Sequence, residues 1–110
     1  MKTPISEYRL KKLMKVIKDY LANASDDLRE EDYSSWGMHL GDASSLAAVY
    51  CYLKDENFEK ARKLTSNLDT AVRDDIPMEI WKYVGLCPLH DYVKNELEVI
   101  ESECEKHENE

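Results

Sequence analysis

The stretch TPISEYRLKKLMKVIKDYLANA, residues 3–24, decides the fold class. Its apolar side chains recur every three or four positions, which is the period of one face of an α-helix. Thr3 suits the N-cap of such a helix, and Pro4 suits its first turn. We therefore predict a helix over residues 4–23, and its apolar face comprises Leu10, Leu13, Met14, Ile17, Tyr20, Leu21 and Ala24.

A second helix is predicted over residues 35–53, with Trp36 and Leu40 on its apolar face. Its first half contains Gly37 and Gly41, and glycine costs ~1 kcal/mol relative to alanine inside a helix. The pattern therefore favours a helix whose better-supported half begins with Asp42 as N-cap.

A short polar connection, residues 54–57, leads to a third predicted helix over 58–73, which Asn57 can cap. Because the connection is so short, we expect the second and third helices to lie antiparallel. The sequence therefore predicts an αα-hairpin over about 42–73.

The C-terminal third begins with Pro77, which suits the start of a short helix that Gly85 would end. A last helix is predicted over 88–106, and residues 105–110 are expected to form a frayed acidic tail. The apolar face of this last helix is predicted to comprise Leu89, Tyr92, Val93, Leu97, Ile100 and Cys104.

The composition agrees with helices joined by short loops, because the 110 residues include only three glycines and three prolines, and 43% are apolar. No segment shows the alternation of a β-strand bounded by turn residues. We therefore predict an all-α protein, a small helical bundle of four main helices plus one short helix, forming a single domain over residues 1–110.

Charge is distributed unevenly along the chain. Residues 1–18 contain six basic residues and one acid, a net charge of +5, whereas residues 19–110 contain nine basic and 22 acidic residues, a net charge of −13. Such asymmetry informs us about partners and solubility. The sequence thus predicts a basic first helix on an acidic body.

Two Cys/His pairs, Cys87 with His90 and Cys104 with His107, contain the ligand types of a structural zinc site. A helix between His90 and Cys104 would span ~21 Å, however, at 1.5 Å per residue. All four ligands must lie within ~2.3 Å of the metal. We therefore expect no metal site within one chain, while a site shared across a dimer stays an alternative.

The dipeptide His90-Asp91 resembles the paired residues of HD-type metal phosphohydrolases, which are also helical. That family also needs an upstream histidine, a place that His39 could take, and a later aspartate. No aspartate follows Asp91. No nucleophile elbow or phosphate-binding glycine loop is present either, so we expect a protein that is not an enzyme and has no cofactor.

Tyr52, Phe58 and Ala61 resemble the junction between the two helices of a tetratricopeptide unit. Ser45 stands where that repeat usually has tryptophan, and Val49 stands where it has a small residue. No second copy follows at a period of ~34 residues. The resemblance therefore implies only an αα-hairpin.

The three cysteines, Cys51, Cys87 and Cys104, form no evident disulfide framework and are typical of reduced thiols. No apolar run approaches the ~20 residues of a membrane span, and the N-terminus lacks the apolar stretch of a secretory signal. We therefore expect a cytoplasmic protein without a membrane partner.

The leading functional hypothesis is a non-enzymatic adaptor or regulator that acts by protein–protein interaction, with a second copy in a homodimer as one candidate partner. The alternative is a phage or mobile-element inhibitor whose acidic surface mimics DNA. Direct nucleic-acid binding is not expected, because the chain as a whole is acidic. The candidate interaction surface comprises Lys11, Lys12, Lys15, Lys18, Asp26, Asp27, Glu30, Glu31, Tyr33, Trp36, Tyr52 and Tyr83.

Overall fold

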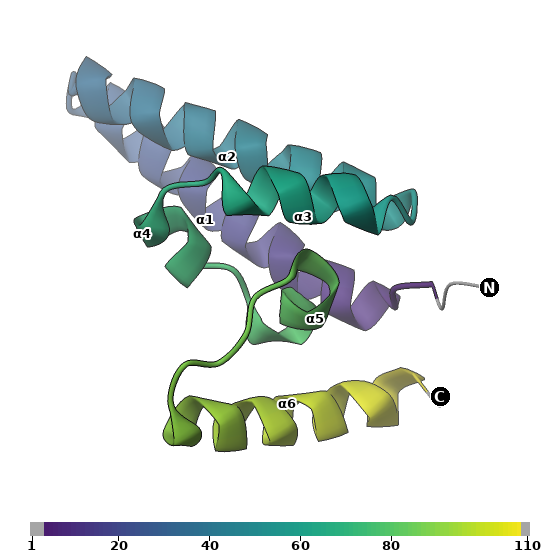
Figure 1. The fold of residues 1–110 in the computed structure, drawn as a ribbon. Coiled ribbons are helices and arrows are strands. Elements are labelled where there is room, and N and C mark those ends of the chain that lie inside the picture. The colour runs from purple at the N-terminus through teal and green to yellow at the C-terminus, as the bar shows by residue number, and fades with distance from the viewer. Residues whose placement is uncertain (1–3, 109–110) are drawn as a thin grey trace.

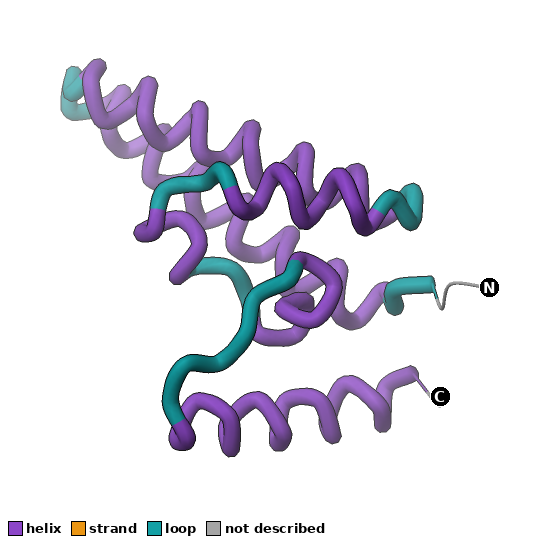
Figure 2. Tube along the Cα trace, in the orientation of Figure 1, coloured by secondary structure: helices purple, strands orange, loops and turns teal. Residues whose placement is uncertain are grey.

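Every regular element of the computed structural model, which describes residues 4–108, is helical (Figures 1 and 2). The predicted fold class, an all-α helical protein, is therefore confirmed. In chain order the elements are α1 (Glu7–Arg29), α2 (Tyr33–Lys54), α3 (Phe58–Ser66), α4 (Thr70–Asp74), the 3-10 turn η1 (Met78–Ile80), α5 (Trp81–Val84) and α6 (Asp91–Glu108).

Helix α1 begins later and ends later than the predicted range of 4–23. Ser6 is its N-cap, and the Ser6 hydroxyl accepts a hydrogen bond from the Arg9 backbone N–H at 3.4 Å. Pro4 precedes the helix, and Thr3 lies outside the described residues. The helix ends at Arg29, and Glu31 then turns the chain with a left-handed φ of 60°.

Helix α2 confirms the predicted range of 35–53 to within two residues at each end, but it continues through Gly37 and Gly41, so Asp42 is not an N-cap. Asp32 is the N-cap, and its carboxylate accepts from the Ser35 N–H at 3.2 Å. Gly37 and Gly41 lie within the helix, and a Cβ added at either would meet nothing within 4 Å. The long contact with α1 stabilises this half of α2 despite its two glycines.

The third predicted helix is divided in two. Asn57 caps α3 as predicted, since its side chain accepts from the Lys60 N–H at 3.3 Å. The helix ends at Ser66, after which the Asn67 and Leu68 N–H groups bond to the Leu64 and Thr65 carbonyls in a tighter turn. The Thr65 hydroxyl donates to the Ala61 carbonyl at 2.8 Å, and the Ser66 hydroxyl donates to the Lys63 carbonyl at 2.7 Å.

The core lies between the α1–α2 hairpin and the shorter elements that cover one side of it. In Figure 1, α3 and α4 lie in front of this hairpin, and α3 packs against both α2 and α5. The fully or almost fully buried apolar side chains come from every one of these elements: Leu10, Leu13, Ile17, Leu46, Val49, Leu53, Ala61, Val72, Ile76, Ile80 and Val84.

Helix α6 lies apart from this core, along η1 and the start of α1 (Figure 1). The apolar face predicted for it is wrong at its N-terminal end, because Leu89 precedes the helix and is 90% exposed and Tyr92 is 70% exposed. Its other predicted members are partly or fully buried: Val93, Leu97, Ile100 and Cys104. Only Cys104 is fully buried in α6. The predicted frayed tail is also corrected, since the helix continues to Glu108, beyond which residues 109–110 lie outside the described part.

None of the helices described between residues 4 and 108 combines the length and the apolar composition needed to cross a membrane.

Candidate functional site

The structure brings together only part of the predicted interaction surface. Asp26 and Asp27 of α1 lie close to Glu30 and Glu31 of the α1–α2 turn, and α2 begins at Tyr33. The ring of Trp36 lies edge-on to that of Tyr33, with centroids 6.5 Å apart. These six residues form one end of the hairpin, which is predominantly acidic.

The remaining predicted aromatic residues lie elsewhere. Tyr52 is half-buried at the far end of α2, where the Lys60 ammonium lies 5.9 Å from its ring. Tyr83 is half-buried in α5 and packs against Phe58 with ring centroids 5.3 Å apart. Neither tyrosine extends the surface at the hairpin turn.

The four lysines Lys11, Lys12, Lys15 and Lys18 follow the N-terminal half of α1. Lys11, Lys15 and Lys18 are exposed, whereas Lys12 is half-buried, with its Nζ 5.0 Å from the Tyr8 ring. The hairpin therefore carries positive charge along one half of α1 and negative charge at its turn.

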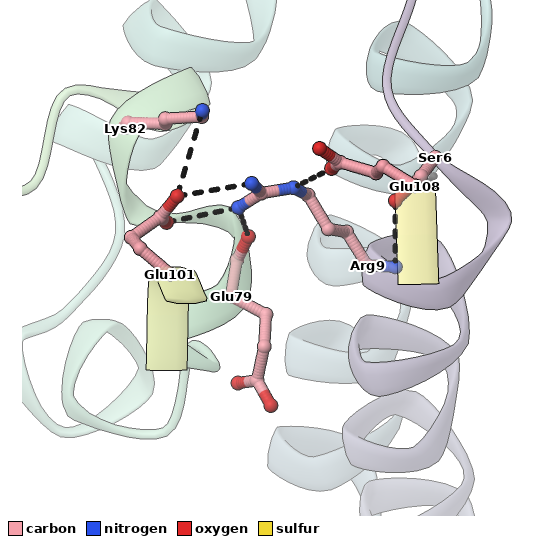
Figure 3. A network of polar contacts seen from close by, with 6 residues as sticks. All are labelled: Ser6, Arg9, Glu79, Lys82, Glu101 and Glu108. Atoms are coloured by element: carbon pink, nitrogen blue, oxygen red, sulfur yellow. Dashed lines mark hydrogen bonds and ion pairs between the residues drawn. The ribbon is translucent and has the colours of Figure 1, made fainter. Parts of the chain in front are cut away.

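Arg9 does not belong to this basic surface, although the sequence places it in the same helix. Its side chain is fully buried. As Figure 3 shows, its Nη1 and Nη2 donate to the two carboxylate oxygens of Glu101, each at 2.9 Å. Nε donates to Glu108 at 2.6 Å, and Nη1 also donates to the Glu79 carbonyl at 2.7 Å. Arg9 thus links α1, η1 and α6.

The electrostatics of this network favour the charged forms of its members. Hydrogen bonds from Arg9 lower the pKa of Glu101, and Lys82, with its Nζ 3.5 Å from Glu101, acts in the same direction. Burial alone would lower the pKa of Arg9, but its hydrogen bonds to Glu101 and Glu108 outweigh burial, and the pKa is raised. Burial raises the pKa of the neighbouring Cys104 thiol. The network is an anchor for α6.

A polar cavity of about 360 Å³ lies between α1, α2 and the segment after α4. The Tyr20 hydroxyl donates to Asp75 at 2.5 Å, and His39 Nδ1 lies 2.5 Å from an Asp27 carboxylate oxygen. Burial and the hydrogen bond to Asp75 raise the pKa of Tyr20. We interpret both contacts as cross-links between elements: Tyr20 with Asp75 holds the hairpin to the end of α4, and His39 with Asp27 holds α2 to α1 within the hairpin.

A second cavity, also about 360 Å³, lies between α4, α5 and the start of α6. Trp81, Leu86 and Val93 make most of it apolar, and Arg73 and His90 add polar groups. His90 and His39 therefore line different cavities, so the histidines of an HD-type site are not assembled. Among residues 4–108, no group of three His, Cys, Asp or Glu side chains is placed to hold a metal ion.

The largest feature that the sequence did not predict is an apolar surface on the hairpin, opposite α3 and α4. Val16, Tyr20 and Asn23 line the polar cavity beside Asp75, so that side of α1 faces α4. Leu21 and Leu28 lie about 90° from Tyr20 around the helix, in the opposite direction. Each of these two leucines is 46% exposed.

Helix α2 contributes to the same surface. Tyr52 lines a cleft with residues of α3, so that side of α2 faces α3. Leu40 and Ala47 lie on the opposite side of the buried stripe of α2 from Tyr52, and therefore away from α3. This is the same side of the hairpin on which Leu21 and Leu28 of α1 lie. Tyr33 is 61% exposed and Leu40 is 37% exposed. We call this surface the outer face, and it comprises Met14, Leu21, Leu28, Tyr33, Trp36, Leu40 and Ala47.

Sequence reasoning missed the outer face because it assigned Leu21 and Leu40 to buried stripes. A signal was nevertheless present. Met14, Leu21 and Leu28 are spaced seven residues apart, as are Tyr33, Leu40 and Ala47. These residues lie beside the buried stripe of their helix, so the apolar face of each helix is wider than one neighbouring helix can cover.

No protein-family model, no curated protein and no solved structure matches the chain.

Proposed function

We propose that this protein is a non-enzymatic adaptor or regulator that acts by binding protein through the outer face of the α1–α2 hairpin. The observation that carries the proposal is the partial exposure of Leu21, Leu28, Tyr33 and Leu40 on one side of two packed helices. Contiguous apolar surface of this kind typically marks an interaction site.

The shape and the rim of the outer face support protein as the ligand. The apolar side chains form two parallel ridges, one on each helix, and within each ridge they recur every seven residues. Such ridges suit the grooves of another helix or helix pair. Exposed lysines, Lys11 and Lys18, lie three residues before Met14 and Leu21 and border the face on α1. An apolar centre with a polar rim is the usual anatomy of a protein interface.

The test is affinity capture from the native host with the tagged wild-type chain and with Leu28→Glu and Leu40→Glu. Both positions are partly exposed, so the variants are expected to fold, as circular dichroism would confirm. Val99→Glu is the matched control, because Val99 is an apolar residue of α6 that is 70% exposed. The proposal predicts a captured protein that both hairpin variants lose and that Val99→Glu retains. Capture that the hairpin variants leave unchanged would refute it.

The alternative is inhibition of a DNA-binding protein by an acidic surface. It is supported by the exposed acids along α6, which are Glu96, Glu98, Glu103 and Glu105. These acids are sparser than duplex phosphates, which supply one charge per ~1.7 Å of axis. Competition with duplex DNA for a DNA-binding protein, with affinity that falls steeply as salt rises, would favour this alternative over the adaptor.

A further inference from the structure

We propose that the outer face binds a second copy of this chain, so that α1 of each copy packs antiparallel against α1 of the other across a two-fold axis at Leu21. This inference depends on the proposed function, because it names the protein that the outer face binds. The dimer would be a bundle of four long helices, two from each hairpin.

The pattern of α1 is self-complementary when it is reversed about Leu21. In an antiparallel pair centred there, Leu21 meets its own copy, and Met14 of one chain lies level with Leu28 of the other. The Met14–Leu28 contact therefore forms twice, once on each side of the axis, as an isologous interface requires.

The charges of the hairpin reverse sign about the same residue. Lys11 lies ten residues before Leu21 in α1, ~15 Å from the axis along the helix, and the acidic turn with Glu30 and Glu31 begins directly after the last residue of α1, Arg29. The antiparallel arrangement therefore places the exposed Lys11 of one copy toward the acidic turn of the other, where Glu30 and Glu31 are exposed. A parallel arrangement would instead bring the like charges together.

The size of the face suits a dimer of modest affinity. Met14 and Leu28 are separated by ~21 Å of helix, and two packed helices, each ~10 Å wide, are together ~20 Å wide, so the face covers about 400 Å² on each copy. The total of about 800 Å² for both copies is below the size of stable interfaces and is typical of weak, transient ones. We expect a dissociation constant on the order of 10 µM at low salt.

Sedimentation of the full chain between 1 and 200 µM, in 50 mM and 500 mM NaCl, tests the association. The expected result is a reversible dimer of the 12.8 kDa chain whose dissociation constant rises severalfold with salt, because the rim charges are screened. Leu21→Glu places two like charges at the axis and should weaken the dimer about a hundredfold. Val99→Glu should leave it unchanged. A wild-type chain that stays monomeric at 200 µM, or a dimer that Leu21→Glu does not weaken, would overturn the inference.

Cross-linking tests the register. The chain with Cys51→Ser and Cys87→Ser removes the two exposed thiols and keeps the buried Cys104. In that background Leu21→Cys should form a disulfide-linked dimer under mild oxidation, since a two-fold axis at position 21 brings the two thiols together. A mixture of Met14→Cys and Leu28→Cys chains should give predominantly the mixed dimer. Equal cross-linking of Leu21→Cys and the control Val99→Cys would refute the antiparallel seam.

These outcomes separate the inference from the proposed function. A monomeric wild-type chain whose hairpin variants still lose a captured host protein would overturn the dimer and leave the adaptor proposal intact. A dimer that Leu21→Glu dissociates, together with capture that Leu28→Glu and Leu40→Glu do not affect, would support the dimer. It would also refute a role of the outer face in binding another protein.

Discussion

Replacement of Arg9 by methionine is predicted to release α6 while leaving the α1–α2 hairpin folded. Methionine approximates the apolar volume of the arginine stem but donates no hydrogen bonds to Glu101, Glu108 or the Glu79 carbonyl. Removing one partner of a buried ion pair typically costs 3–5 kcal/mol, because the other charge stays buried and unpaired. The side chains of Glu101 and Glu108 are 22% and 30% exposed, so water can partly rehydrate them. The expected cost is therefore at the lower limit, about 3 kcal/mol.

Hydrogen exchange measures this effect helix by helix. A cost of about 3 kcal/mol raises the population of undocked α6 by a factor of about a hundred, and the amides of α6 should exchange faster by the same factor. The amides of α2 should change little, since α6 packs on η1 and α1. Arg29→Met is the control, because Arg29 pairs with Asp26 on the surface, where its side chain is 75% exposed. If Arg9→Met changed the exchange of α6 less than threefold, the assignment of Arg9 as the anchor would be refuted.

Three further predictions concern pH, thiol reactivity and glycine. The pKa of Glu101 is lowered in the folded protein, so ionised Glu101 contributes its full stabilisation to the fold above the usual glutamate pKa of about 4.3. That contribution is lost as pH falls through the lowered pKa, and far-UV circular dichroism should therefore show α6 melting in acid below about pH 4. The exposed Cys87 should react with Ellman's reagent in the native protein, whereas the buried Cys104, whose pKa is raised, should react only after denaturant is added, and equal native rates would contradict that burial. Gly41→Ala should raise the free energy of unfolding by about 0.8 kcal/mol in urea titrations, since its helical site is open, whereas Gly85→Ala should lower it by about 1–2 kcal/mol, since φ is +79° there and the new Cβ would lie 3.3 Å from an arginine side chain.

The parts of the fold that could be predicted depend on local signals. The apolar period identified α1 and α2, Asn57 identified the start of α3, and Gly85 identified the end of α5 with its left-handed conformation. These features depend on residues within one or two turns of each other, which a sequence displays directly.

The parts that could not be predicted depend on contacts between distant residues. Arg9 and Glu108 are 99 positions apart, and nothing near either residue indicates that they meet. The face of α6 was therefore assigned from apolar residues alone, which identified Cys104 correctly, while the observed inward side also carries Glu101. Of the proposed outer face, the sequence identified Tyr33 and Trp36 but not Leu21 and Leu40, because these two leucines were each expected to be covered within one chain.

The ionic anchor at Arg9 gives the two halves of this molecule different responses to temperature. The hairpin and α3 are held by apolar burial, whose contribution weakens as water is cooled. The attachment of α6 depends on a buried guanidinium and two carboxylates, and the desolvation penalty of such charges falls as temperature rises. On warming toward the melting transition, the contact of α6 should therefore persist relative to the rest.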